Sequence, residues 1–445
     1  MRASILLLAC LFTGSVCFSP ACKKEIIPDF IFPGVSDYGS EVAQSWNDKF
    51  LEIERDADGY RPLPATRALA YLGLSAYEAC ITGMPNYNSV ATQYPGLLIP
   101  AAGNPESLHW PTVVNASYAY LMHHFFPTAT AEITALEDLN NAVYQAQISN
   151  SEFLLAQHYG RGVAAAVWAW SKTDAIGHDA YLDPFKSHQY QPGNTQSGPK
   201  PLFPDWKQVR TFAISESDKI CAEPWPYGED MNSHFYAEAV EVYARTTNAT
   251  YDNQWMLEFW SDDFLHLTYS TGSRWFSIAN QVFKNDEVNL EIALYTNAKL
   301  GLAINDAAVA CWTSKFHYQV ENPVNYLQTL LDPAWEPLLK NPLTGETEYA
   351  STYASYPSEH ATLAGAAAEV LVNIFGNQYA MTDRSHENNP LFLGFPRSFN
   401  SFYEMAEDCA ASRIVSGLNY RMDCENGVHL GYKCGQKVNG LLWTN

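Results

Sequence analysis

Three short stretches in the second half of the chain combine residue types that can bind an anion. Lys315 is followed seven positions later by Asn322, and Arg413 is followed six positions later by Asn419. Between these two pairs, the run Pro357-Ser358-Glu359-His360 precedes an Ala-rich segment. Lysine and arginine donate charge-assisted hydrogen bonds, and histidine can exchange a proton near neutral pH. The set therefore offers cationic donors and one histidine, which can exchange a proton near neutral pH.

The expected secondary structure helps to bring these residues together. Ser358 is a plausible N-cap for a helix over 361–375 that ends at Gly376, so free backbone N–H groups and the positive end of the helix dipole would face an anion. The seven-residue spacing of Lys315 and Asn322 is nearly two helical turns and predicts that both lie on one helix face.

A helix break is needed at the third stretch. Arg413 ends a predicted helix over 398–413, and Asn419 lies about 240° around an ideal helix from it. The two side chains can reach one site only if the helix breaks between them, which Gly417 allows.

The three stretches resemble the oxyanion site of vanadium-dependent haloperoxidases and type 2 phosphatidic acid phosphatases. In that superfamily a Lys is followed seven positions later by Arg-Pro, a Pro-Ser-x-His run follows, and a Ser-Arg precedes a His that bonds covalently to vanadate or phosphate. Here the spacing is kept, but Asn322 replaces the Arg and Asn419 replaces the His. The resemblance implies an all-α, haloperoxidase-like multi-helix bundle, vanadate as cofactor, and hydrogen peroxide and halide as small-molecule substrates.

The resemblance also implies a role for each residue. His360 would be the catalytic acid–base group, and Trp312 would lie beside the halide site, although a core aromatic is the alternative. Glu359 replaces a common glycine and would repel an oxyanion unless it points away. His317 and His429 are the nearest alternatives in sequence to the missing histidine. The expected oxyanion-binding residues are Lys315, Asn322, Ser358, Glu359, Arg413 and Asn419.

Two substitutions in the donor set determine the functional interpretation. An amide nitrogen has no lone pair comparable to that of imidazole, so Asn419 cannot form the covalent bond. We expect a haloperoxidase homologue with an altered, weakened oxyanion site. The alternatives are an active haloperoxidase that holds vanadate by hydrogen bonds alone, an acid phosphatase of the same superfamily, and a non-enzymatic surface binding protein.

Composition and charge restrict the partners. The chain has 445 residues, of which 47% are hydrophobic and 14% aromatic, as in a packed globular protein. Its formal net charge of -22 argues against nucleic acid or an anionic membrane surface as a partner, because phosphate groups require basic patches.

Helical periodicity recurs along most of the chain, with short polar or proline-bearing joints. The predicted helices cover 41–57, 64–79, 108–126, 128–147, 152–171, 231–245, 252–264, 271–283, 287–310, 361–375 and 398–413. The Pro- and Gly-rich segment 181–206 is interpreted as an ordered loop, with an interdomain linker as the alternative. We expect one helical domain over 23–445, with the oxyanion-site half at about 250–445.

The N-terminal segment predicts export. A basic start and an apolar run over 5–18 are typical of a secretory signal, and Ala21-Cys22-Lys23 resembles a bacterial lipid-attachment site. We therefore expect a signal peptide over 1–22, a lipid anchor on Cys22 as the membrane contact, and a location in the periplasm or at the cell surface. A plainly cleaved signal is the alternative. Six cysteines remain for disulfides or buried thiols: Cys80, Cys221, Cys311, Cys409, Cys424 and Cys434.

The lipid anchor gives a first prediction. Cys22→Ala should move the protein from the membrane fraction to the soluble fraction, because the acyl chains supply the membrane affinity. Cell fractionation followed by immunoblotting measures this change, and an unchanged distribution would argue for a protein that is not lipidated at Cys22.

Overall fold

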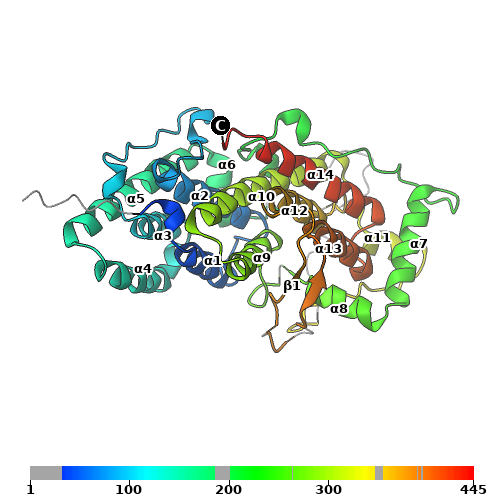
Figure 1. The fold of residues 1–445 in the computed structure, drawn as a ribbon. Helices are drawn as coiled ribbons and strands as arrows, with labels where there is room; N and C mark the ends of the chain where they lie inside the picture. Colours follow the sequence, from blue (N-terminus) through cyan, green and yellow to red (C-terminus); the bar gives the residue numbers. More distant parts are fainter. Residues whose placement is uncertain are drawn as a thin grey trace, which may run out of the picture. The chain divides into compact units, whose positions relative to one another are not determined.

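The helix α10 (Leu290–Tyr318) contacts many of the other helices. It packs against α2 (Leu63–Cys80), α12 (Glu359–Phe375) and α14 (Arg421–Asn439), as Figure 1 shows. Nearly all residues of α10 are buried, which explains why its sequence is apolar and rich in alanine on every face. Its last turn carries Lys315.

The computed structural model describes residues 33–185, 201–262, 264–345, 354–387, 389–391 and 394–444. Within these ranges the chain is mostly helical, as predicted. The remaining longer elements are α1 (Glu41–Glu54), α3 (Trp110–Phe125), α4 (Thr130–Gln145), α5 (Asn150–Ser171), α6 (Ala175–His178), α7 (His234–Thr247), α8 (Tyr251–Phe259), α9 (Thr271–Asn285), α11 (Pro323–Leu330) and α13 (Phe402–Ser416).

One small sheet interrupts the helices. Strands β1 (Met381–Asp383) and β2 (Arg397–Phe399) pair antiparallel, with Thr382 opposite Ser398. The helix predicted over 398–413 therefore begins later, at Phe402, where the Ser401 side chain caps it by accepting a hydrogen bond from the Glu404 amide. The predicted start was wrong because the serine-rich run 398–401 contains both a strand end and a cap.

The segment predicted as a long loop is only partly within the described residues. Its interior, 186–200, lies outside them. At its two ends the Phe203 amide donates a hydrogen bond to the Pro184 carbonyl over 2.7 Å, and Leu202 and Trp206 are buried in the core. Both ends of the segment are therefore packed.

The six cysteines of the mature chain, from Cys80 to Cys434, are buried free thiols. This agrees with the second of the two expectations for them. Met1–Ile31, which include Cys22, lie outside the described part, so the signal peptide and its boundary stay predictions. Phe32–Asn445 form one compact unit. None of the described helices has the length and apolar character needed to cross a bilayer.

Helices α12 and α14 approach each other closely through glycines. A Cβ added at Gly431 of α14 would overlap the Thr362 carbonyl oxygen of α12, and a Cβ at Gly365 would overlap the Val428 carbonyl oxygen. Backbone thus packs directly on backbone. This contact fixes the start of α12, which carries Ser358 and His360, relative to the start of α14.

This packing predicts opposite effects for two glycine-to-alanine substitutions. Gly431→Ala should lower the free energy of unfolding by roughly 1–3 kcal/mol, because the new methyl group forces the helices apart. Gly162→Ala in α5, where a Cβ would meet only Pro100 Cγ at 3.8 Å, should instead raise it by roughly 0.5–1 kcal/mol through helix propensity. Urea denaturation measures both. Equal effects of the two substitutions would contradict the close-packing argument.

Candidate oxyanion centre

The chain leaves its helix between Lys315 and Asn322. Helix α10 ends at Tyr318, and Gln319 adopts a left-handed conformation with φ of 51°. Asn322 is instead the N-cap of α11, where its side chain accepts a hydrogen bond from the Asn325 amide over 3.1 Å. The prediction that Lys315 and Asn322 share one helix face is therefore wrong. The Asn-Pro sequence favours a helix start at this point, since proline suits the first turn and disfavours a helical residue before it.

The N-terminus of α12 was predicted correctly. Ser358 is its N-cap, and its hydroxyl accepts a hydrogen bond from the Ala361 amide over 3.5 Å. The Ser358 amide donates to the Asp423 carbonyl over 2.9 Å, which ties α12 to α14. His360 Nε2 lies 3.0 Å from the Thr271 hydroxyl of α9. Three elements, α12, α14 and α9, therefore determine where this histidine lies.

The predicted break between Arg413 and Asn419 is confirmed. Gly417 ends α13 with φ of 84°, a left-handed conformation that glycine adopts readily. The Asn419 amide then donates back to the Arg413 carbonyl over 3.3 Å. This tight corner turns the chain from α13 into α14, so both residues border the same interior region.

The main-chain carbonyl of Ser355 lies at the middle of the site. It accepts one hydrogen bond from Lys315 Nζ over 3.0 Å and another from Asn419 Nδ2 over 3.0 Å. Lys315 Nζ also donates to the Ala354 carbonyl over 2.8 Å. Asn419 Nδ2 lies 3.2 Å from Asp423 Oδ2, which also accepts the Ser355 hydroxyl. Two residues expected to bind an oxyanion thus donate to backbone of the same chain.

The predicted site residues are all buried, each with an exposed fraction of 7% or less. Burial lowers the pKa of Lys315, and the Arg413 guanidinium acts in the same direction, whereas Asp423 and Glu359 oppose it. Burial also holds the pKa of His360 well below 6.5, with Arg413 and Lys315 nearby adding to the effect. These mutual electrostatic effects indicate that Lys315, His360 and Arg413 lie near one another, with His360 neutral at physiological pH.

Carboxyl groups balance the cations of this centre. Lys315 interacts electrostatically with the Glu359 and Asp423 carboxyl groups as well as with Arg413. Burial raises the pKa of Asp423 to about 6. Arg413 Nε is buried and forms no hydrogen bond among the described residues. The centre therefore keeps one buried donor that an anion could use, but it has little net positive charge.

Other predicted residues lie at the edge of this centre or away from it. The Trp312 indole is fully buried, donates to the Leu202 carbonyl over 3.0 Å, and has its ring centre 5.7 Å from Lys315 Nζ. It is thus a core aromatic that also borders the site. His317 and His429 are both exposed, so neither replaces the missing histidine.

Comparisons with known proteins identify the fold. Residues 296–442 match the family model described as the VCPO second helical-bundle domain. The structure of the first bacterial vanadium-dependent iodoperoxidase matches with a TM-score of 0.81 and 24% identity, over 91% of this chain and 97% of that one. A holo-type bacterial vanadium-dependent chloroperoxidase matches with a TM-score of 0.57 and 12% identity, over 93% and 94% of the two chains. No curated protein matches at the sequence level.

These matches define the class of protein. The chain has the helical fold of bacterial vanadium haloperoxidases, and its C-terminal part, which carries the candidate centre, matches the family model of their second bundle. The chain therefore shares the fold of these haloperoxidases, in agreement with the fold that the sequence resemblance implied.

The residues present do not fit a covalently held vanadate. The amide nitrogen of Asn419 is a donor and points to Ser355 and Asp423, so it offers no lone pair to a metal. The side-chain oxygen of Asn322 caps α11. Arg413 remains as an anion donor, because its buried Nε has no hydrogen-bond partner among the described residues.

Sequence reasoning missed three residues of the centre. Asp423 is the third residue of α14, where its carboxylate accepts a hydrogen bond from the amide of the N-cap Tyr420, and an acidic residue at this position is a capping signal that could have pointed to it. Ser355 acts mainly through its carbonyl group, which no residue type reveals. Thr271 reaches His360 from 89 positions away, and no local pattern signals such a contact.

The raised pKa of Asp423 predicts a pH effect on stability. The folded state binds this proton more tightly than the unfolded chain, for which the pKa is 3.8. The stabilisation is fully present below about pH 4 and is lost as the pH rises through about 6. The unfolding free energy of the wild type relative to Asp423→Asn should therefore fall by up to about 3 kcal/mol between pH 4 and 7. Denaturant titrations at several pH values measure it.

The matched control is Glu425→Gln, which removes an exposed carboxyl from the same helix. The difference in unfolding free energy between the wild type and Glu425→Gln should change little over this pH range. A difference between the wild type and Asp423→Asn that is independent of pH would show that burial does not perturb this carboxyl.

Proposed function

We propose that this chain is a haloperoxidase-like protein with an altered oxyanion centre, which binds vanadate or phosphate weakly and does not turn over halide. One observation carries this proposal: the Ser355 carbonyl accepts hydrogen bonds from both Lys315 Nζ and Asn419 Nδ2. In the superfamily that the sequence resembles, the residues at these two positions are ligands of the oxyanion. Here both contribute to an internal polar network.

The size of the expected loss follows from the two substitutions. A charge-assisted hydrogen bond contributes roughly 1.5–3 kcal/mol, so asparagine in place of the first arginine should weaken oxyanion binding by roughly tenfold to a hundredfold. The absence of a covalent anchor at Asn419 adds to this loss. Glu359 and Asp423 further reduce the positive potential that a multiply charged anion requires.

A second candidate is an active haloperoxidase that holds vanadate by hydrogen bonds alone. The buried, unpaired Nε of Arg413 and the neutral His360 support it, since they could bind an anion and accept a proton. Hydrogen peroxide and a halide would then be the substrates, by likeness to the iodoperoxidase and chloroperoxidase. An acid phosphatase is less well supported, because its phosphoenzyme requires the histidine that Asn419 replaces. With either candidate function, we also propose that the protein is exported and lipid-anchored at Cys22.

Restoring the two family residues tests the proposal. Asn419→His should return a covalent anchor, and the Asp423 carboxylate, now 3.2 Å from the Asn419 amide, could orient the imidazole. Asn322→Arg should return one positive charge. Both changes act on one bound ion, so the double variant should exceed the sum of the single variants. Vanadate binding by calorimetry and iodide or bromide peroxidation with hydrogen peroxide should be measured on all four proteins.

One control separates the effect of the added positive charge from the effect of the lost helix cap. Asn322→Arg also removes the cap of α11, which costs about 1 kcal/mol, whereas Asn322→Ser keeps a cap without adding charge. The serine variant should leave vanadate binding unchanged. If the unmodified protein already equals the double variant in turnover, the second candidate becomes the function. A folded double variant that binds no vanadate would show that the likeness is one of fold alone.

A further inference from the structure

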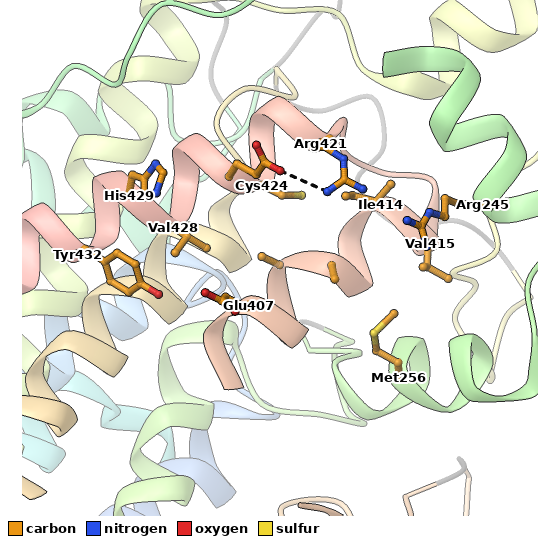
Figure 2. Close-up of a pocket in the computed structure, with 13 residues that line it drawn as sticks. Arg245, Met256, Glu407, Ile414, Val415, Arg421, Cys424, Val428, His429 and Tyr432 are labelled. Atoms are coloured by element: carbon orange, nitrogen blue, oxygen red, sulfur yellow. Dashed lines mark hydrogen bonds and ion pairs between the residues drawn. The ribbon is translucent and has the colours of Figure 1, made fainter. Parts of the chain in front are cut away.

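A pocket lies on the side of α13 that faces away from the oxyanion centre. It has a volume of about 470 Å³ and is lined by α13 and α14 with contributions from α7 and α8. We call it the outer groove. Its apolar wall includes Met256, Ile414 and Val428. Figure 2 shows Glu407 and Tyr432 towards one end and Arg245 and Arg421 towards the other.

The outer groove is separate from the oxyanion centre. On α13, Arg413 faces the centre, whereas Glu407 and Ile414 line the groove. On α14, Asp423 faces the centre, whereas Val428 lines the groove. A volume within roughly 300–1,000 Å³ and a mainly apolar wall with a few polar groups are typical of small-molecule sites.

The two arginines of the groove are neutralised by carboxylates. Arg421 forms ion pairs with Glu241 and, over 3.2 Å, with Glu425. Arg245 Nε lies 3.5 Å from the same Glu241 carboxylate. This end of the groove therefore has no excess positive charge with which to attract an anion.

The opposite end carries an uncompensated negative charge. Glu407 is exposed and forms no ion pair or side-chain hydrogen bond within the described part of the chain. The adjacent carboxylate, Asp408, is by contrast bound to Arg397 over 2.9 Å and to the Trp260 indole over 2.7 Å. Glu407 is thus the charge in the groove that is available to a ligand.

Tyr432 provides an aromatic surface next to this carboxylate. Both residues line the groove, and Figure 2 shows the Tyr432 hydroxyl directed toward Glu407. The half-buried ring can offer its face to a cation. A carboxylate beside an aromatic face is a combination that suits an ammonium group.

We propose that the outer groove binds an organic amine, with an apolar body against Met256, Ile414 and Val428 and its ammonium group against Glu407 and Tyr432. The ligand class follows from charge complementarity, because the cationic end is already paired and the anionic end is not. This inference goes beyond the proposed function and does not depend on the oxyanion centre.

Three naphthalene probes that share one ring system and carry a cationic, a neutral or an anionic group test the proposal. Calorimetry with 1-naphthylmethylammonium, 1-naphthalenemethanol and 1-naphthylacetate should show that the full-length protein binds the ammonium most tightly and the acetate least. Glu407→Gln should weaken ammonium binding by at least about tenfold and leave the neutral alcohol unchanged. Glu132→Gln, which removes an exposed carboxylate on the distant α4, should have no effect.

A second variant locates the site. Ala411 is exposed and lines the groove, so Ala411→Trp should fill it without replacing a buried side chain and should abolish binding of all three probes. Three results would overturn the proposal: equal affinity for ammonium and alcohol, ammonium binding that survives in Ala411→Trp, or unchanged affinity in Glu407→Gln. Circular dichroism confirms that each variant is folded.

Discussion

The burial of one lysine ammonium determines how this site is organised. Lys315 retains 1% of its exposure, and an ammonium group removed from water is very unfavourable unless it is hydrogen-bonded. The Ala354 and Ser355 carbonyls supply that compensation. Because these two residues immediately precede α12, the same contact fixes the approach to Ser358 and His360. The Lys315 ammonium thus holds the end of α10 against the start of α12. The close backbone packing of α12 on α14 then positions α14.

The substitution at position 419 is chemically consistent with this arrangement. An amide has two N–H donors on one nitrogen, and Asn419 directs that nitrogen to the Ser355 carbonyl and to Asp423 Oδ2. A neutral imidazole has only one N–H group, so it could not make both contacts. Asparagine therefore adds a second donor to the Ser355 carbonyl, which Lys315 also binds, and a further donor to the Asp423 carboxylate. Such a network is stable because its members are paired. We therefore interpret the centre as an altered site with its own hydrogen bonds, not as a damaged haloperoxidase site.

The sequence predicted the helices well and the contacts between them poorly. Periodicity reports burial on one face, and the caps at Ser358 and Gly417 depend on local chemistry, so these features are visible in a short window. The prediction that Lys315 and Asn322 share one helix face was wrong because α10 ends at Tyr318, Gln319 is left-handed, and the Asn322-Pro323 step begins a new helix. The role of Ser355 was not predictable, because its partner Asn419 is 64 residues away and the contact uses a backbone atom.

The charge of the whole chain bears differently on the two sites. A net charge of -22 produces a negative potential that repels an approaching oxyanion and attracts an organic cation. An oxyanion centre in such a protein needs a strong local excess of positive charge, but Glu359 and Asp423 balance Lys315 and Arg413. At the outer groove, by contrast, the local charge of Glu407 and the overall charge of the protein have the same sign. For an anion, the balanced centre thus offers little local attraction to offset the overall repulsion, whereas for a cation in the groove the local and long-range electrostatics act together.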